Sequence, residues 1–147
     1  MEAFVCKVCG FTSINGQAPD RCPVCGAPKT SFEEKQDAIN APKDSNNPSD
    51  LEKKHVPVVD IKRQCGLVGP GCVDANIKVG AVLHVMEAKH YIMYIDLYLD
   101  KDFIARYHMV AEKLNPVLGV HLKAAAGKLS ALENCNLHGR WIAETEI

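Results

Sequence analysis

The sequence predicts a mainly β protein in which a small metal-binding domain precedes an antiparallel β-sandwich. Short segments rich in valine and isoleucine, broken by glycine and proline, recur between residues 55 and 147, as they do in sandwich domains. Four cysteines in two close pairs lie within the first 25 residues, whereas all six histidines lie at or after His55. This separation of ligand types indicates two metal sites of different chemistry.

Composition limits the classes of function. The 147 residues are 47% hydrophobic and 24% charged, with a formal net charge of -1, so nucleic-acid binding is not expected. No apolar run approaches the roughly 20 residues that a membrane span needs. The N-terminus lacks the basic and apolar regions of a secretory signal, which makes the cytoplasm the expected location. In that reducing compartment, seven cysteines favour metal ligation over disulfides.

Three segments are expected along the chain. Residues 1–36 form the metal-binding domain, residues 37–50 are a linker rich in Asn, Asp, Ser and Pro, and residues 51–147 form the sandwich. Strands are expected at residues 55–61, 75–85, 90–99, 117–124 and 141–147. A turn is expected at residues 113–116, because proline does not join a central strand. Residues 31–39 have helical character, and residues 124–132 fit either a helix or a strand.

The first metal site is predicted from two CxxCG motifs. They contain the cysteines Cys6, Cys9, Cys22 and Cys25. Each tight turn can direct two thiolates at one tetrahedral metal, and Gly10 and Gly26 let backbone amides approach the sulfurs. About 36 residues cannot build an adequate core without such a metal. Zinc and iron both suit four thiolates.

A resemblance favours iron at this site. The segments FVCKVCGFT and RCPVCGAPKTSFE, with the trailing Phe32, resemble the rubredoxin-type domain at the end of rubrerythrins. The resemblance implies a mononuclear Fe(Cys)4 centre that carries one electron. A structural zinc ribbon is the alternative.

The second metal site is predicted from three further fragments. EKKHVPVV, HVMEAKHYI and CNLHGRW resemble, in order and spacing, the iron domain of superoxide reductases, the family that includes desulfoferrodoxin and neelaredoxin. The resemblance covers roughly residues 52–147. It implies an immunoglobulin-like sandwich, with the iron in exposed loops at one end. It also implies five iron ligands, which are His55, His84, His90, Cys135 and His138.

The same resemblance implies the reaction and the partners. Superoxide accepts one electron and is protonated to hydrogen peroxide, and a rubredoxin-like or other reduced donor restores the ferrous iron. Lys54 matches the family's catalytic lysine, which attracts superoxide and organises the water that supplies a proton. Family members assemble as dimers or tetramers, so a homodimer is expected.

The chain departs from the family pattern at three points. Lys53 replaces a glutamate that can occupy the sixth position of oxidised iron, and Glu52 is the nearest substitute, although strand alternation would point it elsewhere. Val85 replaces a proline beside the ligand His84. The front domain has CxxC spacing in its second motif, where two-iron members commonly carry adjacent cysteines. The two halves therefore resemble an independent fusion of a rubredoxin-type domain with a superoxide reductase domain.

Other interpretations remain open at the level of sequence. The chain could be an iron electron carrier without a catalytic vacancy, or a zinc-scaffolded binding module. His108 and His121 match no motif and are interpreted as ordinary strand residues. For Cys65 and Cys72, two free thiols in a loop insertion are favoured over a redox disulfide or an extra metal site.

Overall fold

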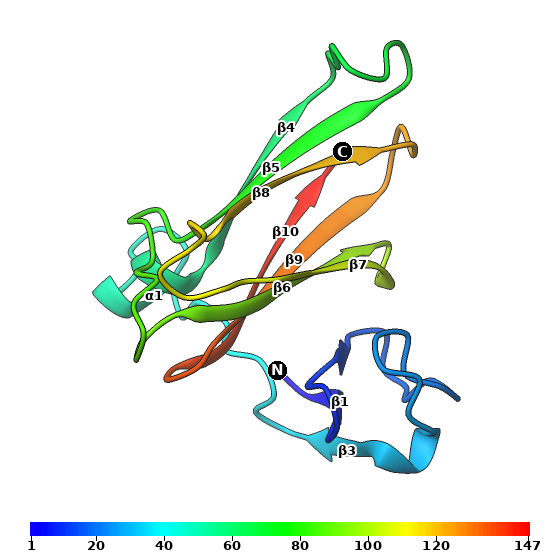
Figure 1. Cartoon of the computed structure of the whole chain (residues 1–147), viewed down its shortest axis with the longest axis vertical. Coiled ribbons are helices and arrows are strands. Elements are labelled where there is room, and N and C mark those ends of the chain that lie inside the picture. Colours follow the sequence, from blue (N-terminus) through cyan, green and yellow to red (C-terminus); the bar gives the residue numbers. More distant parts are fainter.

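The computed structural model describes all residues, 1–147, and has two parts (Figure 1). The front part is a three-stranded antiparallel sheet in the order β2-β1-β3, formed by β1 (Ala3–Cys6), β2 (Thr12–Ser13) and β3 (Phe32–Lys35), with the 3-10 helix η1 (Lys29–Ser31) before β3. Cys6 is the last residue of β1, and the other three cysteines of the two motifs lie in the loops that follow β1 and β2.

The second part is a sandwich of two antiparallel sheets. One sheet has the order β10-β9-β6-β7 and the other has the order β4-β5-β8. The strands are β4 (Pro57–Lys62), β5 (Val73–Val79), β6 (Ile92–Leu99), β7 (Asp102–His108), β8 (Val117–Leu122), β9 (Lys128–Cys135) and β10 (Gly139–Glu146). A short helix, α1 (Asp50–His55), precedes β4. The predicted fold class is thus confirmed.

The main core lies between the two sheets. In β5, every second residue from Val73 to Val79 is buried, as the period of a half-buried strand requires. These side chains pack with Ile95 and Leu97 of β6 and with Leu129 of β9, all fully buried. Each buried valine, isoleucine or leucine side chain stabilises the fold by about 1.5–3 kcal/mol.

A second core joins the front part to the outer face of the four-stranded sheet. Phe11 packs between Phe103 and Tyr98, with ring centroids 5.2 and 6.2 Å away. The hydroxyl of Tyr98 donates to the carbonyl oxygen of Thr12 at 2.6 Å. Ile39 is buried in the same cluster, so the beginning of the predicted linker packs as part of the core.

Four local predictions were wrong or incomplete. Residues 31–39 are not helical, because β3 pairs with β1 in the register Cys6↔Phe32. His55 ends a helix rather than beginning a strand. The strand expected at 75–85 stops at Val79, before Gly80 with φ +82°. Residues 128–135 are a strand, β9, and β7 was not predicted. No helix is long and apolar enough to span a membrane.

Candidate metal centres

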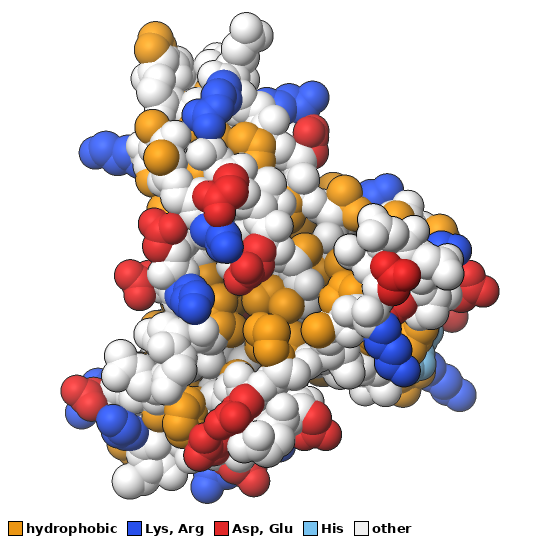
Figure 2. Space-filling view, turned by 180° about the vertical axis from the view of Figure 1, so that it is seen from behind, with side chains coloured by type: hydrophobic (Ala, Val, Ile, Leu, Met, Phe, Trp, Pro, Cys, Tyr) orange, Lys and Arg blue, Asp and Glu red, His pale blue; other side chains and the backbone are white.

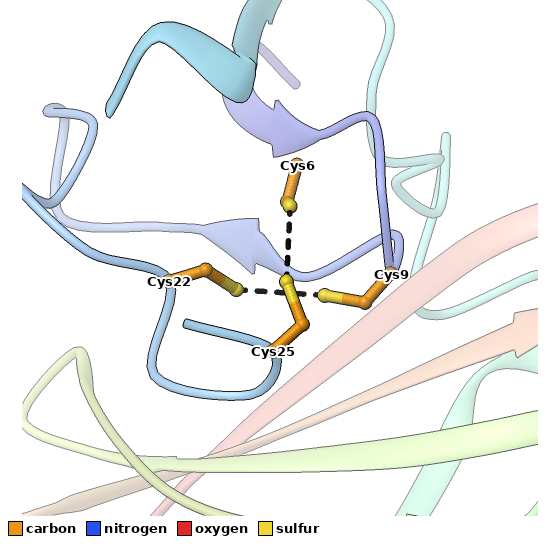
Figure 3. A group of neighbouring side chains, drawn as sticks. All are labelled: Cys6, Cys9, Cys22 and Cys25. Carbon is orange, nitrogen blue, oxygen red and sulfur yellow. Dashed lines mark hydrogen bonds between the residues drawn. The ribbon is translucent and has the colours of Figure 1, made fainter. Parts of the chain in front are cut away.

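The four front cysteines converge on one point (Figure 3). The sulfurs of Cys6 and Cys25 lie 3.7 Å apart and those of Cys9 and Cys22 lie 3.4 Å apart. All four sulfurs lie within 4.8 Å of one another. Tetrahedral bonds of about 2.3 Å to zinc place thiolates about 3.8 Å apart, so the arrangement fits a tetrahedral thiolate site.

The same backbone turn presents each pair of cysteines. Gly10 N–H donates to the Cys6 carbonyl at 2.9 Å, and Gly26 N–H donates to the Cys22 carbonyl at 2.8 Å. Both glycines have a positive φ, +77° and +75°, which a residue with a Cβ rarely adopts. Burial raises the pKa of the Cys9 and Cys22 thiols. A metal ion must therefore displace protons when it binds there.

The four predicted histidine ligands form a square. Ring centroids along its sides lie 4.7 Å apart for His55–His84, 4.6 Å for His84–His90, 5.0 Å for His90–His138 and 4.9 Å for His138–His55. The diagonal from His55 to His90 is longer, 6.4 Å, as a square requires. The imidazoles thus surround one central position.

Hydrogen bonds to backbone carbonyls orient two of these rings. The Nδ1 of His55 lies 2.7 Å from the Leu51 carbonyl oxygen, and the Nδ1 of His84 lies 2.6 Å from that of Val85. A carbonyl only accepts, so each Nδ1 carries the proton and each Nε2 has a free lone pair. The Nε2 atoms of His55, His84 and His90 are buried and have no hydrogen-bond partner. Such unpaired buried nitrogens fit a metal ion.

Cys135, the last residue of β9, and His138, in the turn between β9 and β10, complete the cluster. The sulfur of Cys135 lies 3.7 Å from His138 Nδ1. The potential ligand atoms of His55, His90, Cys135 and His138 all lie within 4.8 Å of one another. In Figure 1, α1, the beginning of β6 and the β9–β10 turn all lie at the same end of the sandwich, at the lower left of the view. The structure therefore brings together all five residues that the sequence predicted.

Residues that were not singled out from the sequence hold this turn and the neighbouring loop together. The side chain of Asn136 accepts from Tyr91 N–H at 2.9 Å and donates to the Lys89 carbonyl at 3.0 Å, which binds the turn to the loop carrying His90. Trp141 stacks on the ring of His55 at 5.4 Å and donates to the His138 carbonyl at 3.3 Å. Both residues lie within the CNLHGRW fragment, which was the signal available in the sequence.

Burial favours the neutral form of two of the imidazoles, His55 and His84. It lowers the pKa of His55, and it lowers that of His84 to about 4, although the bond to the Val85 carbonyl opposes the shift. Burial also raises the pKa of the Cys135 thiol. Neutral imidazoles with one thiol that ionises on binding are a donor set that iron(II) accepts.

Glu52 and Lys53 are engaged away from the square. The carboxylate of Glu52 accepts from Lys43 N–H at 2.8 Å and from Ser49 N–H at 2.6 Å, and these bonds lower its pKa. The Lys53 amino group lies 3.7 Å from Asp50 at the surface. Glu52 was expected to point away from the iron because of strand alternation. That reason was wrong, because this segment is a helix. Lys54 is exposed on α1, next to His55.

Two loop cysteines lie in a third cluster. Cys65 and Cys72 belong to the loop between β4 and β5, and their sulfurs approach His121 Nδ1 to 3.3 and 3.6 Å. His121 lies in strand β8, as predicted. Its Nδ1 also lies 2.8 Å from Oδ1 of Asp74. His108 lies in β7 and in none of the three clusters.

Comparisons with known proteins agree with this two-part description. The family model for desulfoferrodoxin matches residues 47–144, and that for the rubredoxin-like domain of rubrerythrin matches residues 4–33. A desulfoferrodoxin of Desulfarculus baarsii is 38% identical over 101 residues, covering 68% of this chain and 70% of that protein. One of Syntrophotalea carbinolica is 29% identical over 98% of this chain and 96% of its own length. The solved superoxide reductase of Nanoarchaeum equitans superposes with a TM-score of 0.55 at 30% identity, over 65% of this chain and 94% of its own.

Proposed function

The chain belongs to the desulfoferrodoxin family, and on that premise we propose that it is a superoxide reductase. Superoxide takes up one electron and two protons and becomes hydrogen peroxide. The observation that carries the proposal is the square of four imidazoles, in which three buried Nε2 atoms have no protein partner and Cys135 lies beside the fourth ring. Iron held by these five residues supplies the electron.

Each of the chain's residues has a defined task at this site. His55, His84, His90, His138 and Cys135 bind the iron. The carbonyls of Leu51 and Val85 keep the lone pairs of two rings directed at the centre. Lys54 attracts the anion and orients a proton-bearing water. Acidic and basic side chains are mixed over the face shown in Figure 2, so this attraction must come from local charge.

The front centre serves as an electron relay, with Cys6, Cys9, Cys22 and Cys25 holding iron. A hydrogen-bonded route supports this role. The hydroxyl of Tyr94 donates to the carbonyl oxygen of Gly10, next to Cys9, at 2.8 Å. The amide of Asn134, next to Cys135, donates to the same hydroxyl at 3.0 Å.

Replacing one hydroxyl on this route tests the relay. Tyr94→Phe is expected to slow re-reduction of the enzyme by an external donor several-fold, while the rate with superoxide stays unchanged. Tyr98→Phe is the matched control, since its hydroxyl bonds to Thr12 and has no contact with Asn134. Equal re-reduction rates in the two variants would contradict the relay.

The remaining partners follow from the same assignment. The external electron donor is a reduced rubredoxin-like protein, and the enzyme is a homodimer. The expected location is the cytoplasm, because seven cysteines without a disulfide suit a reducing compartment. Light scattering of the purified protein tests the assembly, and the mass of a single chain would contradict it.

Metal analysis and reaction with superoxide test the enzyme assignment together. Protein made with iron available is expected to contain two irons per chain and to develop a thiolate-to-iron absorption band on oxidation. The ferrous form should react rapidly with superoxide generated by a radiation pulse. His90→Ala should lose one iron and the reaction, whereas His108→Ala should keep both. A slow reaction of the fully loaded protein would favour the electron carrier, and a colourless zinc protein would favour the binding module.

A further inference from the structure

The loop between β4 and β5, residues 63–72, has no hydrophobic packing that explains its position. Leu67 and Val68 are 84% and 68% exposed, so the loop contributes little to the core. Gly69 and Gly71 have φ values of +99° and +87°, which permit tight turns. The loop nevertheless brings Cys65 and Cys72 over the outer face of the β4-β5-β8 sheet.

Two strand residues meet these cysteines on that face. Asp74 of β5 and His121 of β8 are direct cross-strand partners, and the neighbouring Val73 and Ala75 point into the core. Asp74 and His121 therefore both face outward. His121 Nδ1 lies 2.8 Å from Asp74 Oδ1, and the sulfur of Cys72 lies 3.4 Å from the same oxygen.

The distances in this cluster match those of a metal site. One ligand atom from each of Cys65, Cys72, Asp74 and His121 lies within 4.8 Å of all the others, the same limit that the four front cysteines meet. The sulfurs lie 3.3 and 3.6 Å from His121 Nδ1. Tetrahedral zinc, with bonds of about 2.1–2.3 Å, requires ligand atoms roughly 3.4–3.8 Å apart. The Asp74–His121 pair, at 2.8 Å, must open slightly to fit this range.

We propose that Cys65, Cys72, Asp74 and His121 form a third metal site, which binds zinc and fixes the β4–β5 loop to β8. Two thiolates, one imidazole and one carboxylate are all zinc ligands, and four of them close a tetrahedral structural site. Lys123 lines the adjoining surface pocket of about 420 Å³, together with Cys72 and His121.

The third site lies apart from the histidine square. His55 comes just before β4 and Cys65 comes shortly after it, and β4 has six residues. At about 3.3 Å per residue, the two sites are separated by roughly 20 Å along the strand. Loss of the zinc should therefore leave the iron sites and the reaction with superoxide intact, so the two proposals fail independently.

Zinc and iron counts in matched variants test the proposal. We expect anaerobically purified wild-type protein, made with zinc and iron available, to hold one more zinc per chain than Cys65→Ser/Cys72→Ser, with the same iron content. His121→Ala should lose the same zinc, whereas His108→Ala, another exposed strand histidine, should retain it. Equal zinc in wild type and the double variant, or a third iron in place of zinc, would overturn the proposal.

Alkylation of the wild-type protein supplies a second measurement that does not depend on variants folding. Cys65 and Cys72 are expected to resist iodoacetamide until a strong zinc chelator is added, and then to react. Immediate reaction of both thiols would overturn the site. A Cys65–Cys72 disulfide in the anaerobic protein would also overturn it, since a disulfide sulfur cannot serve as a thiolate ligand.

Discussion

At the scale of single residues, Lys54 is the positive charge that the chain places immediately before an iron ligand. Lys54→Met is expected to lower the second-order rate constant with superoxide about tenfold at low salt, because local charge raises the encounter rate of an anion. The difference should shrink as salt is added. Lys53→Met is the matched control, because Lys53 pairs with Asp50 at the surface. A Lys54→Met enzyme that keeps the wild-type rate at low salt would remove Lys54 from the mechanism.

Glu133 is expected to make the free energy of unfolding depend on pH. Its side chain is fully buried, neither oxygen has a hydrogen-bond partner, and burial raises its pKa well above 4.5. Above about pH 4.3 the unfolded chain releases this proton while the folded chain keeps it, so stability falls as pH rises towards the folded pKa. Glu133→Gln should remove this dependence. The free energy of unfolding of the variant, relative to that of the wild type, should therefore increase with pH by up to about 1.4 kcal/mol per pH unit. Urea unfolding of both proteins at pH 5 and pH 8 measures it, and a constant difference would contradict the assignment.

The proposed metal ligands were easier to single out from the sequence than the residues that orient them. The five ligands of the histidine site and the four front cysteines stand in spaced motifs, and the structure brings each set together. The carbonyls of Leu51 and Val85 could not be predicted, because backbone partners leave no mark in a sequence. The contact between Cys65 and His121 could not be predicted either, because it depends on the register of β5 and β8.

At the scale of secondary-structure elements, α1 positions the ligand His55. Ser49 begins this helix with a capping box, in which its hydroxyl accepts from Glu52 N–H and the Glu52 carboxylate accepts from Ser49 N–H. Ser49→Ala should destabilise the protein by about 1 kcal/mol. Because His55 is the last residue of the helix, iron should also dissociate faster to a chelator. Wild-type iron retention with normal stability would show that α1 does not position His55.

Helix α1 also shows where the prediction of secondary structure from the sequence fails. The valines after His55 suggested a strand from residue 55, whereas Ser49-x-x-Glu52 was an available helix-start signal. Residues 31–39 carry charged residues that favour a helix, but pairing with β1 makes them extended. In β6, Ile95 and Leu97 face the core between the sheets, whereas Tyr94 and Tyr98 lie on the other face, as the alternation of a strand requires. Ile92 joins the core side because of an irregularity between Ile92 and Tyr94.

At the scale of the whole molecule, the two parts are joined through a buried ion pair. Arg106 donates to both carboxylate oxygens of Asp96 at 2.6 Å, and its third nitrogen donates to the Cys9 carbonyl at 2.8 Å. The guanidinium also lies 3.7 Å from the centre of the Tyr94 ring. One side chain thus connects β6 and β7 to the first cysteine turn, and it does so beside the hydrogen-bonded route through Tyr94.

Arg106→Met tests whether this pair holds the two parts together. The change leaves Asp96, which is fully buried, without its partner, and such a loss costs about 3–5 kcal/mol. Urea unfolding followed by Trp141 fluorescence should shift to lower concentration. Cleavage within residues 41–48 by a protease should accelerate as the front part separates.

Asp96→Asn/Arg106→Met should recover most of the stability of the sandwich, because no unpaired charge remains buried. It should stay as sensitive to the protease as the single variant, because the bond to the Cys9 carbonyl is still missing. If the double variant resists the protease as the wild type does, the aromatic cluster around Phe11 holds the two parts together without the ion pair.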